Sequence, residues 1–297
     1  MAENFFEIQS GYFTASEKNK VNNVNLVIEK QGDIVSLLGP SGIGKTTILR
    51  TIAGLQKLSK GKFKLRKKVL GSDDKHIEPE KRNVALSFQD NSLFPNYKVI
   101  DNINFGKKRL NGSGSVIDSS EIIKLLKRIN LTTIVVTHDS YEAFSMADKC
   151  GIILDQQLKQ YDVPYNVHHE PNSIEVANFL NKGVFIDVEI IDSECAVHRL
   201  KHAELGEIRG KLSNKFPSGS KARLLLQPED LIHDDHSKLK LDVVDRKFRG
   251  TNFIYTLKTK TGEHLPVFVH SHHIHQHEEN EKFGVQSPIY IDHLVCF

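Results

Sequence analysis

A glycine-rich stretch near the N-terminus has the residue types and spacing of a phosphate-binding loop. In such a loop, glycines let consecutive backbone N–H groups point at phosphate oxygens, a lysine adds a full positive charge, and the following hydroxyl binds Mg²⁺. The stretch follows an apolar run and opens a helical pattern, a context that disfavours a chance glycine-rich turn. We therefore predict a site for a nucleoside triphosphate and Mg²⁺, in which Lys45 contacts the β- and γ-phosphates and Thr46 the metal. The predicted loop matches G-x-x-x-x-G-K-[ST] and consists of Gly39, Pro40, Ser41, Gly42, Ile43, Gly44, Lys45, Thr46 and Thr47.

Two polar residues follow apolar runs further along the chain, where strands of a sheet would end. Gln89 comes after the run 84–88, and His138 comes after the run 133–137. Ligands of open α/β sheets bind beyond the carboxyl ends of the strands, so both side chains are candidates to face the nucleotide. A lone glutamine or histidine is more often a solvated or internally bonded polar residue, so neither position defines a site by itself.

The apolar pattern between residues 33 and 155 predicts the elements that position these groups. The predicted helix that begins at Lys45 would turn Ile48, Leu49, Ile52 and Leu55 inward. Strands that alternate with helices indicate an α/β fold of the P-loop NTPase type, with a mainly parallel sheet and helices on both faces. The predicted strands are 34–38, 84–88, 133–137 and 152–154, and the predicted helices are 45–55, 121–129 and 141–147.

The pattern changes after about residue 181. Apolar and polar residues alternate in 239–243 and again in 253–257, and turn residues surround Gly262. This is typical of antiparallel strands. We therefore expect a nucleotide domain over residues 1–180 and a small, antiparallel, β-barrel-like domain over residues 181–297.

The overall composition excludes several classes of function. A net charge of +3 gives no support for nucleic-acid binding. The three cysteines show no C-x-x-C spacing, which indicates reduced thiols in the cytosol. No apolar run approaches the ~18 residues of a membrane span, and the N-terminus lacks the pattern of a signal peptide. Any association with a membrane would then go through a partner.

Taken together, the motifs of the first half resemble those of ABC transporter ATP-binding subunits. The resemblance implies that the ligand is ATP, that Gln89 contacts Mg²⁺ and the attacking water, and that His138 contacts the γ-phosphate; with Lys45 these are the predicted catalytic residues. It also implies an aromatic residue stacked on adenine, for which Tyr12 is the candidate, with Phe13 beside it. A P-loop kinase or GTPase gives no reason for this pair of motifs. The resemblance rests on Gly39–Thr47 (Walker A), Ser87–Asp90 with Leu93–Pro95 (Q-loop) and Val136–Asp139 with Glu142–Ala143 (H-loop).

The second half resembles the TOBE-like regulatory domain that is attached to importer ATPases. The segment 226–231 resembles its R-P-E-D motif, although Gln227 stands where that motif has arginine, and 248–250 continues the pattern. The resemblance implies that the chain has partners: transmembrane permease subunits, a second ATPase subunit in a homodimer and, indirectly, a periplasmic or lipoprotein substrate-binding protein. It places the chain at the cytoplasmic face of the inner membrane. The segments 183–185 and 271–273 look most like the iron(III) branch; molybdate, sulfate, polyamines and sugars are the alternatives.

One stretch departs from the family pattern. The family carries an L-S-G-G-Q signature and a Walker B strand ending in Asp-Glu between the Q-loop and the H-loop, and neither occurs here. A Gly-Ser linker at 111–115 lies in that place, so these parts look deleted near 106–118, with Asp118 as a remnant of the D-loop. The run 152–155 mimics Walker B but follows the H-loop and is rejected. We expect ATP binding with poor hydrolysis, in either an importer ATPase or a nucleotide-binding regulator without turnover.

Histidines are concentrated near the C-terminus, from His264 to His277. His270 and His272 would share one strand face, and His273, His275 and His277 the other. A metal-sensing site is one interpretation, and an exposed polar strand is the other. Imidazole suits Zn²⁺, Ni²⁺ or Cu²⁺ better than Fe³⁺, so the cluster gives no support for iron.

Overall fold

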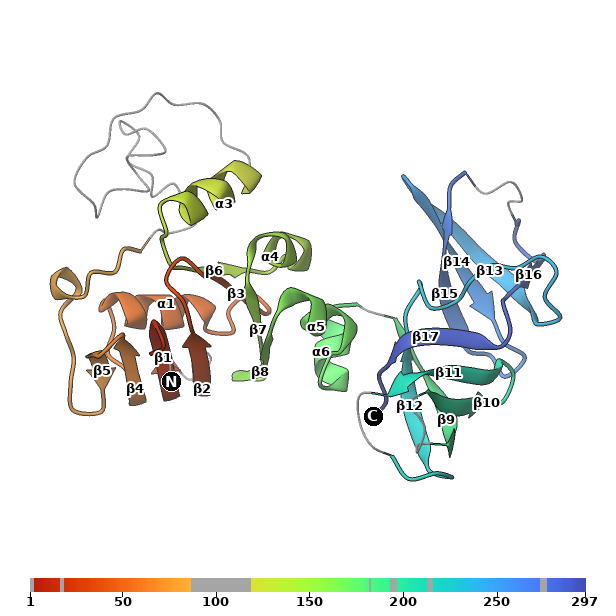
Figure 1. Cartoon of the computed structure of the whole chain (residues 1–297), viewed down its shortest axis with the longest axis horizontal. Helices are drawn as coiled ribbons and strands as arrows, with labels where there is room; N and C mark the ends of the chain where they lie inside the picture. The colour runs from red at the N-terminus through yellow and green to blue at the C-terminus, as the bar shows by residue number, and fades with distance from the viewer. Residues whose placement is uncertain are drawn as a thin grey trace. The chain divides into compact units, whose positions relative to one another are not determined.

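The structure is a computed structural model that describes residues 3–16, 19–86, 119–181, 183–192, 197–212, 216–272 and 277–297. The chain divides into two compact units, Met1–Val167 and His168–Phe297, whose elements are labelled in Figure 1. The sequence placed the border between the domains at 180 instead. Among the described helices, none is long and apolar enough to cross a membrane.

The first unit is built on an eight-stranded sheet with the order β5-β4-β1-β2-β8-β7-β3-β6. β3 pairs in parallel with β6 and β7, and β2 pairs in parallel with β8. Its strands are β1 (Phe6–Thr14), β2 (Lys20–Ile28), β3 (Ile34–Leu38), β4 (Lys60–Leu65), β5 (Lys68–Ser72), β6 (Thr133–Thr137), β7 (Lys149–Leu154) and β8 (Gln157–Asp162).

The α/β class is confirmed, but the sheet is mixed where a mainly parallel one was predicted. The pairs β1–β2, β4–β5 and β7–β8 are antiparallel, and so is β1–β4. Short connections cause this for the first three pairs, because only an antiparallel pair can be joined by a tight turn, while a parallel pair needs a long crossover. The parallel pairings are concentrated around β3, the strand that leads into the predicted phosphate-binding loop.

The helices of this unit follow most of the predicted positions. The helix predicted over 45–55 ends earlier, because Gly54 takes a left-handed conformation with φ 92° and stops it, so Leu55 is 57% exposed instead of inward. The described helices are α1 (Lys45–Ala53), the short 3₁₀ helix η1 (Pro79–Lys81), α3 (Ser119–Arg128), α4 (Ser140–Met146), α5 (Pro164–His169) and α6 (Ile174–Phe179).

The strand predicted at 84–88 is not formed over residues 84–86, and 87–88 lie outside the described residues. An apolar run becomes a strand only when a neighbouring strand bonds to it. Within the described residues, β6 pairs with β3 alone and ends the sheet.

The core of the first unit joins α1 to the sheet. Ile48 and Ile52 of α1 pack with Phe13 and Phe63 from β1 and β4. Arg82 is 1% exposed and lies at the C-terminal end of α1, where its guanidinium donates hydrogen bonds to the carbonyl oxygens of Thr51 (2.6 Å) and Ile52 (2.9 Å). The same side chain bonds the carbonyl oxygen of Ile77 and lies over the Phe63 ring. These bonds satisfy carbonyls that the last turn of a helix leaves without partners.

The second unit is β-rich, as predicted. Two sheets share one apolar core, which includes Leu200, Leu224, Tyr255, Val267 and Phe283. The pairings are antiparallel except between β11 and β17. One sheet has the order β12-β9-β10-β11-β17, with β9 (Val184–Asp192), β10 (His198–His202), β11 (Gly206–Leu212), β12 (Lys221–Leu226) and β17 (Ile289–Leu294). The other has the order β15-β14-β13-β16, with β13 (Lys240–Arg249), β14 (Asn252–Lys258), β15 (His264–His270) and β16 (Lys282–Gly284).

Among the C-terminal histidines, His270 and His272 do not share a strand face as the sequence predicted. β15 ends at His270, and His272 lies in the turn that follows it; both side chains are exposed. His277 is buried, at 3% exposed. His273 and His275 lie outside the described residues. β15 ends before His272, so it cannot align the side chains of His270 and His272.

Candidate functional site

The predicted phosphate-binding loop forms the turn from β3 into α1. Gly44 is the N-cap of α1 and has φ 108°, a left-handed conformation that favours glycine. A Cβ atom at Gly44 would lie 2.7 Å from Cγ2 of Val21, and one at Gly39 would lie 2.3 Å from the carbonyl oxygen of Ile153. Both distances are shorter than a side chain tolerates. Glycine is therefore required at these two positions for the loop to pass close to β2 and β7.

Lys45 is held inside this loop. Its Nζ donates hydrogen bonds to the carbonyl oxygens of Gly39 at 2.6 Å and Pro40 at 2.8 Å. The side chain is half-buried, and this burial lowers the pKa of its amine. The charge therefore has two neutral acceptors and is placed where an anion can replace them.

The first turn of α1 has the properties of an anion-binding helix end. Gly44 offers no side-chain cap, and no acidic residue lies in this turn. The first N–H groups of a helix have no partner within it, and its dipole places partial positive charge there. Thr46 is exposed, while Thr47 is buried. The backbone and Lys45 thus present positive charge to the same space.

His138 reaches this space from the neighbouring strand. Thr137 at the end of β6 pairs with Leu38 at the end of β3, so His138 begins next to the loop. The turn after it is fixed: the hydroxyl of Thr137 donates to Oε2 of Glu142 at 2.7 Å and accepts from the N–H of Asp139 at 3.1 Å. The Asp139 carboxylate then caps α4. These contacts hold the backbone on which the exposed imidazole of His138 stands.

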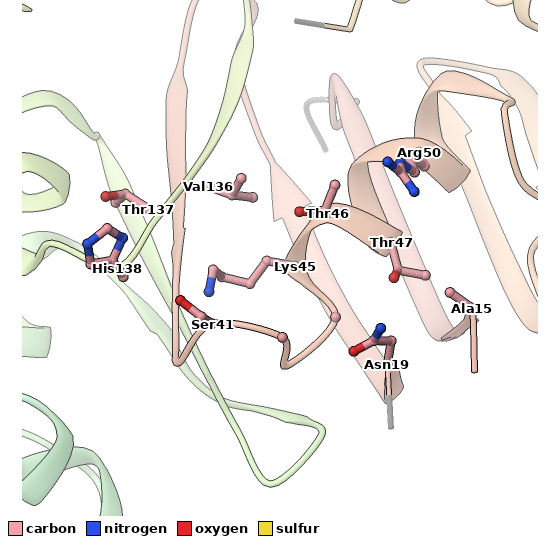
Figure 2. Close-up of a pocket in the computed structure, with 12 residues that line it drawn as sticks. Ala15, Asn19, Ser41, Lys45, Thr46, Thr47, Arg50, Val136, Thr137 and His138 are labelled. Carbon is pink, nitrogen blue, oxygen red and sulfur yellow. The ribbon is translucent and has the colours of Figure 1, made fainter. Parts of the chain in front are cut away.

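A pocket of about 380 Å³ lies at the junction of these elements. Figure 2 shows Lys45 between Ser41 and the end of β6 that carries His138. Hydroxyl groups and cations line the described part of this pocket, but no carboxylate does. The pocket is therefore suited to bind a polyanion, and its described lining offers no carboxylate that could abstract a proton. The lining residues are Ala15, Asn19, Ser41, Gly42, Gly44, Lys45, Thr46, Thr47, Arg50, Val136, Thr137 and His138.

The structure brings together most of the predicted site residues, and it leaves others outside the lining. Gly39 and Pro40 contribute carbonyl oxygens to Lys45, and Ile43 packs against the core. Tyr12 is half-buried beneath the Lys60 ammonium and does not line the pocket. It lies on the face of β1 opposite Phe13, which is fully buried. The prediction for Gln89 falls outside the described residues.

The sequence analysis missed Ala15, Asn19 and Arg50 among the lining residues. Arg50 follows Thr46 by four residues and so shares its helix face, a signal that helical spacing provides. Ala15 and Asn19 lie between β1 and β2, and only the sheet pairing brings that connection to the loop.

The fold and this site define a P-loop nucleotide-binding protein of the α/β class. Residues 21–154 match the model of the ABC transporter family. This segment is therefore an ABC transporter ATP-binding domain, of the ABC ATPase type.

Relatives along nearly the whole chain agree with this. A protein of Hahella chejuensis named "Spermidine/putrescine import ATP-binding protein PotA" is 25% identical, with 92% of this chain and 91% of the relative covered. "Spermidine/putrescine import ATP-binding protein PotA 2" of Pseudomonas aeruginosa is 27% identical, with 87% of each covered. The chain is thus homologous to ATP-binding subunits of ABC importers.

Among solved structures, cbiO1 from Clostridium perfringens, part of an ABC transporter complex, is similar with a TM-score of 0.40 and 18% identity. The similarity covers 59% of this chain and 95% of that one.

Proposed function

We propose that the pocket at the start of α1 binds ATP together with Mg²⁺. The observation that carries this proposal is the convergence of the Lys45 ammonium, the uncapped first turn of α1 and His138 on one space. Lys45 and the amides would bind the β- and γ-phosphates, and His138 the γ-phosphate. The exposed hydroxyl of Thr46 is an oxygen donor of the kind that Mg²⁺ prefers, and phosphate oxygens and water would complete its shell. Gln89 remains the second predicted Mg²⁺ contact.

We further propose that the chain binds ATP but hydrolyses it slowly. The sequence has no L-S-G-G-Q signature and no Asp-Glu after an apolar strand before His138. The described lining of the pocket likewise contains hydroxyls and cations but no carboxylate. The alignment with the Hahella relative runs over 339 positions, more than the 297 residues of this chain, so that relative has residues opposite gaps here. Loss of a general base lowers rates by roughly 10²–10⁴-fold.

In the cell, the proposed role is that of the ATP-binding subunit of an importer for polyamines. The names of the relatives support spermidine or putrescine as cargo; they give no support to iron(III), which the sequence had favoured, or to molybdate, sulfate or sugars. Two copies would act with transmembrane permease subunits at the cytoplasmic face of the inner membrane. A substrate-binding protein would deliver the cargo to the permease.

Two measurements test this proposal. The first compares the dissociation constant of ATP–Mg²⁺ with the rate of phosphate release by the purified chain. Measurable binding with slow release supports the proposal; release at about 1 s⁻¹ or faster, in the usual range of enzyme turnover, contradicts slow hydrolysis. The second compares uptake of labelled spermidine and labelled iron(III) in cells with and without the gene. Unchanged spermidine uptake with reduced iron uptake would restore the iron(III) prediction.

A further inference from the structure

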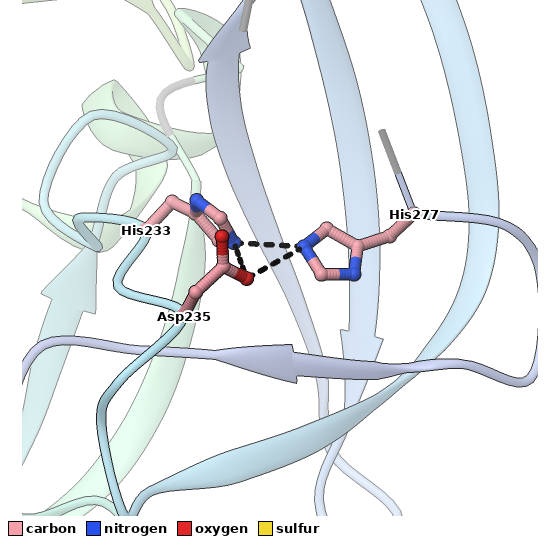
Figure 3. A group of neighbouring side chains, drawn as sticks. All are labelled: His233, Asp235 and His277. Atoms are coloured by element: carbon pink, nitrogen blue, oxygen red, sulfur yellow. Dashed lines mark hydrogen bonds and ion pairs between the residues drawn. The ribbon is translucent and has the colours of Figure 1, made fainter. Parts of the chain in front are cut away.

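Two buried histidines and one aspartate meet in the second unit, away from the nucleotide pocket. His233 lies in the connection between β12 and β13 and forms a backbone bridge with Val285. Asp235 follows two residues later, and His277 lies in the connection between β15 and β16. Figure 3 shows the two imidazoles facing each other, with the carboxylate beside them. The sequence had assigned His277 to a local cluster, whereas its partners come from a segment far away in the chain.

The three ligand atoms lie close enough together to bind one metal ion after a small movement of one ring. Nε2 of His233 lies 2.7 Å from Nε2 of His277. Oδ1 of Asp235 lies 3.3 Å from the first of these nitrogens and 3.7 Å from the second. Tetrahedral Zn²⁺ binds nitrogen and oxygen at about 2.0–2.2 Å, which separates its ligand atoms by about 3.3–3.5 Å. The two distances to Asp235 already lie near this range, and a small rotation of one ring widens the third.

The chemistry of the triangle also favours a cation. An imidazole nitrogen without a proton and a carboxylate oxygen are both acceptors, so three such atoms in close contact need shared positive charge. A single metal ion satisfies the lone pairs of all three atoms at once.

The site is rigid and largely closed. The side chains of His233 and His277 are 6% and 3% exposed. The Phe283 ring packs against both imidazoles, with centroid distances of 4.5 and 4.9 Å. The backbone of His277 is also fixed, since its N–H donates to the Tyr255 hydroxyl at 3.4 Å and its carbonyl accepts from Arg246 at 3.2 Å. A site held in this way loses little conformational freedom when an ion binds.

The segment that carries His233 and Asp235 is also held in place by hydrogen bonds. The Asp234 N–H donates to the Gly284 carbonyl at 2.9 Å, and the Gln286 N–H donates to the Ile232 carbonyl at 2.9 Å. The Lys240 ammonium bonds the carbonyl of Asp235 at 2.6 Å. The Asp235 side chain itself is 38% exposed, which leaves an entry for an ion and a place for a water ligand.

The outer face of one ring lies near a carboxylate. An oxygen of the Glu281 carboxylate lies 3.8 Å from Nδ1 of His277. Histidine ligands in proteins usually direct the second ring nitrogen at a carboxylate or a carbonyl, which fixes the tautomer. At 3.8 Å the Glu281 oxygen is too far from Nδ1 for a hydrogen bond, so Glu281 lies near this ring without fixing its tautomer.

We propose that His233, Asp235 and His277 bind one divalent transition-metal ion of the Zn²⁺ class, with water as the fourth ligand. Two imidazoles with one carboxylate suit Zn²⁺, Ni²⁺ or Cu²⁺, whereas Mg²⁺ and Ca²⁺ prefer sites made of oxygen alone. The ion joins the connection before β13 to the connection before β16, so its binding stabilises the second unit. This site is independent of the proposed nucleotide function.

The test uses the full chain, freed of metal with a chelator and without nucleotide. Zn²⁺ affinity is measured by competition with a chromophoric chelator, and thermal unfolding is followed with and without Zn²⁺. We expect one tight Zn²⁺ per chain. At a free Zn²⁺ concentration 100 times the dissociation constant, the melting temperature of the second unit should rise on the order of 10 °C.

Two variants address the ligands and two serve as matched controls. His233→Gln should weaken Zn²⁺ binding at least about 100-fold and Asp235→Asn about 10- to 100-fold, because even outer-shell changes cost this much. His264→Gln and His270→Gln, on exposed histidines of β15, should leave the affinity unchanged. Circular dichroism and thermal unfolding without metal confirm that each variant folds.

Three results would overturn the proposal. The first is no tight Zn²⁺ in the wild-type chain, which would leave only a hydrogen-bonded histidine pair. The second is unchanged affinity in both folded ligand variants. The third is a loss of affinity in the β15 controls equal to that of His233→Gln, which would assign the ion to the exposed histidines.

Discussion

Replacing Lys45 by methionine tests the nucleotide site most directly, because the change removes the charge and keeps the length of the side chain. In the structure, Nζ bonds two carbonyl oxygens, at 2.6 and 2.8 Å. Binding of ATP therefore exchanges these neutral partners for phosphate oxygens. The contribution of Lys45 to affinity is the difference between the two sets of contacts.

The size of this difference follows from simple electrostatics. Two unit charges about 4 Å apart near a protein surface attract each other by roughly 4 kcal/mol. The two carbonyl bonds that are given up contribute about 1 kcal/mol each. The net loss in Lys45→Met is then about 2 kcal/mol, which corresponds to a roughly thirtyfold higher dissociation constant for ATP–Mg²⁺.

The assay is a titration of the purified chain with a fluorescent ATP analogue in the presence of Mg²⁺. Lys45→Arg keeps the charge and should lose less affinity than Lys45→Met. Lys57→Met removes an exposed lysine that does not line the pocket, and it should have no effect. A dissociation constant for Lys45→Met within threefold of wild type would refute the reasoning and the assignment of the site.

Three further changes probe the scaffold. Gly44→Ala should abolish ATP binding in a folded protein, because its Cβ would meet Val21 in a left-handed conformation; affinity close to wild type in a titration would contradict this. Arg82→Met should lower the free energy of unfolding by about 3 kcal/mol, since it removes the hydrogen bonds of a buried guanidinium to the carbonyls of Thr51, Ile52 and Ile77; denaturant unfolding measures it, and a loss below about 1 kcal/mol would be inconsistent. Burial raises the pKa of the Asp230 carboxyl to about 7, and the nearby carboxylates of Glu229 and Asp292 act in the same direction, while a hydrogen bond from the Gln227 N–H opposes them. Because the pKa is raised in the folded state, the protonated carboxyl contributes stability that is fully present below about pH 4 and is lost as the pH rises through about 7. Between these pH values, the free energy of unfolding of Asp230→Asn should therefore rise relative to wild type by roughly 1.4 kcal/mol per pH unit. Unfolding curves at several pH values that show a constant difference would speak against a raised pKa.

Local sequence patterns predicted the strands and helices around β3. They failed where the formation of a strand depends on hydrogen bonds to a neighbouring strand. The apolar runs at 34–38 and 133–137 form strands with the predicted bounds. The first is buried between two parallel neighbours, β7 and β6, and the second bonds to β3 along its whole length. The run at 84–86 is equally apolar but pairs with none of the strands among the described residues. Strand propensity is a property of single residues, whereas the hydrogen bonds of a sheet need two neighbouring strands.

The same limit applies to the sites. The phosphate-binding loop is contiguous, so its chemistry could be read from spacing alone. The pairing of His277 with His233 joins residues 44 positions apart in the chain, and only the arrangement of the second unit brings them together. Alternation along β1 turns Phe13 into the core and Tyr12 to the opposite face, so the adenine contact of Tyr12 stays a prediction.

Arg82 gives α1 a second fixed end. A helix of nine residues is about 14 Å long and behaves as a stiff rod over that length. One end of this rod holds the loop around Lys45, and the other is tied by a guanidinium to the chain near η1. A displacement of the segment that carries Arg82 is therefore transmitted along the helix axis to the phosphate-binding end. Residues that never touch the nucleotide can in this way alter how tightly it is held.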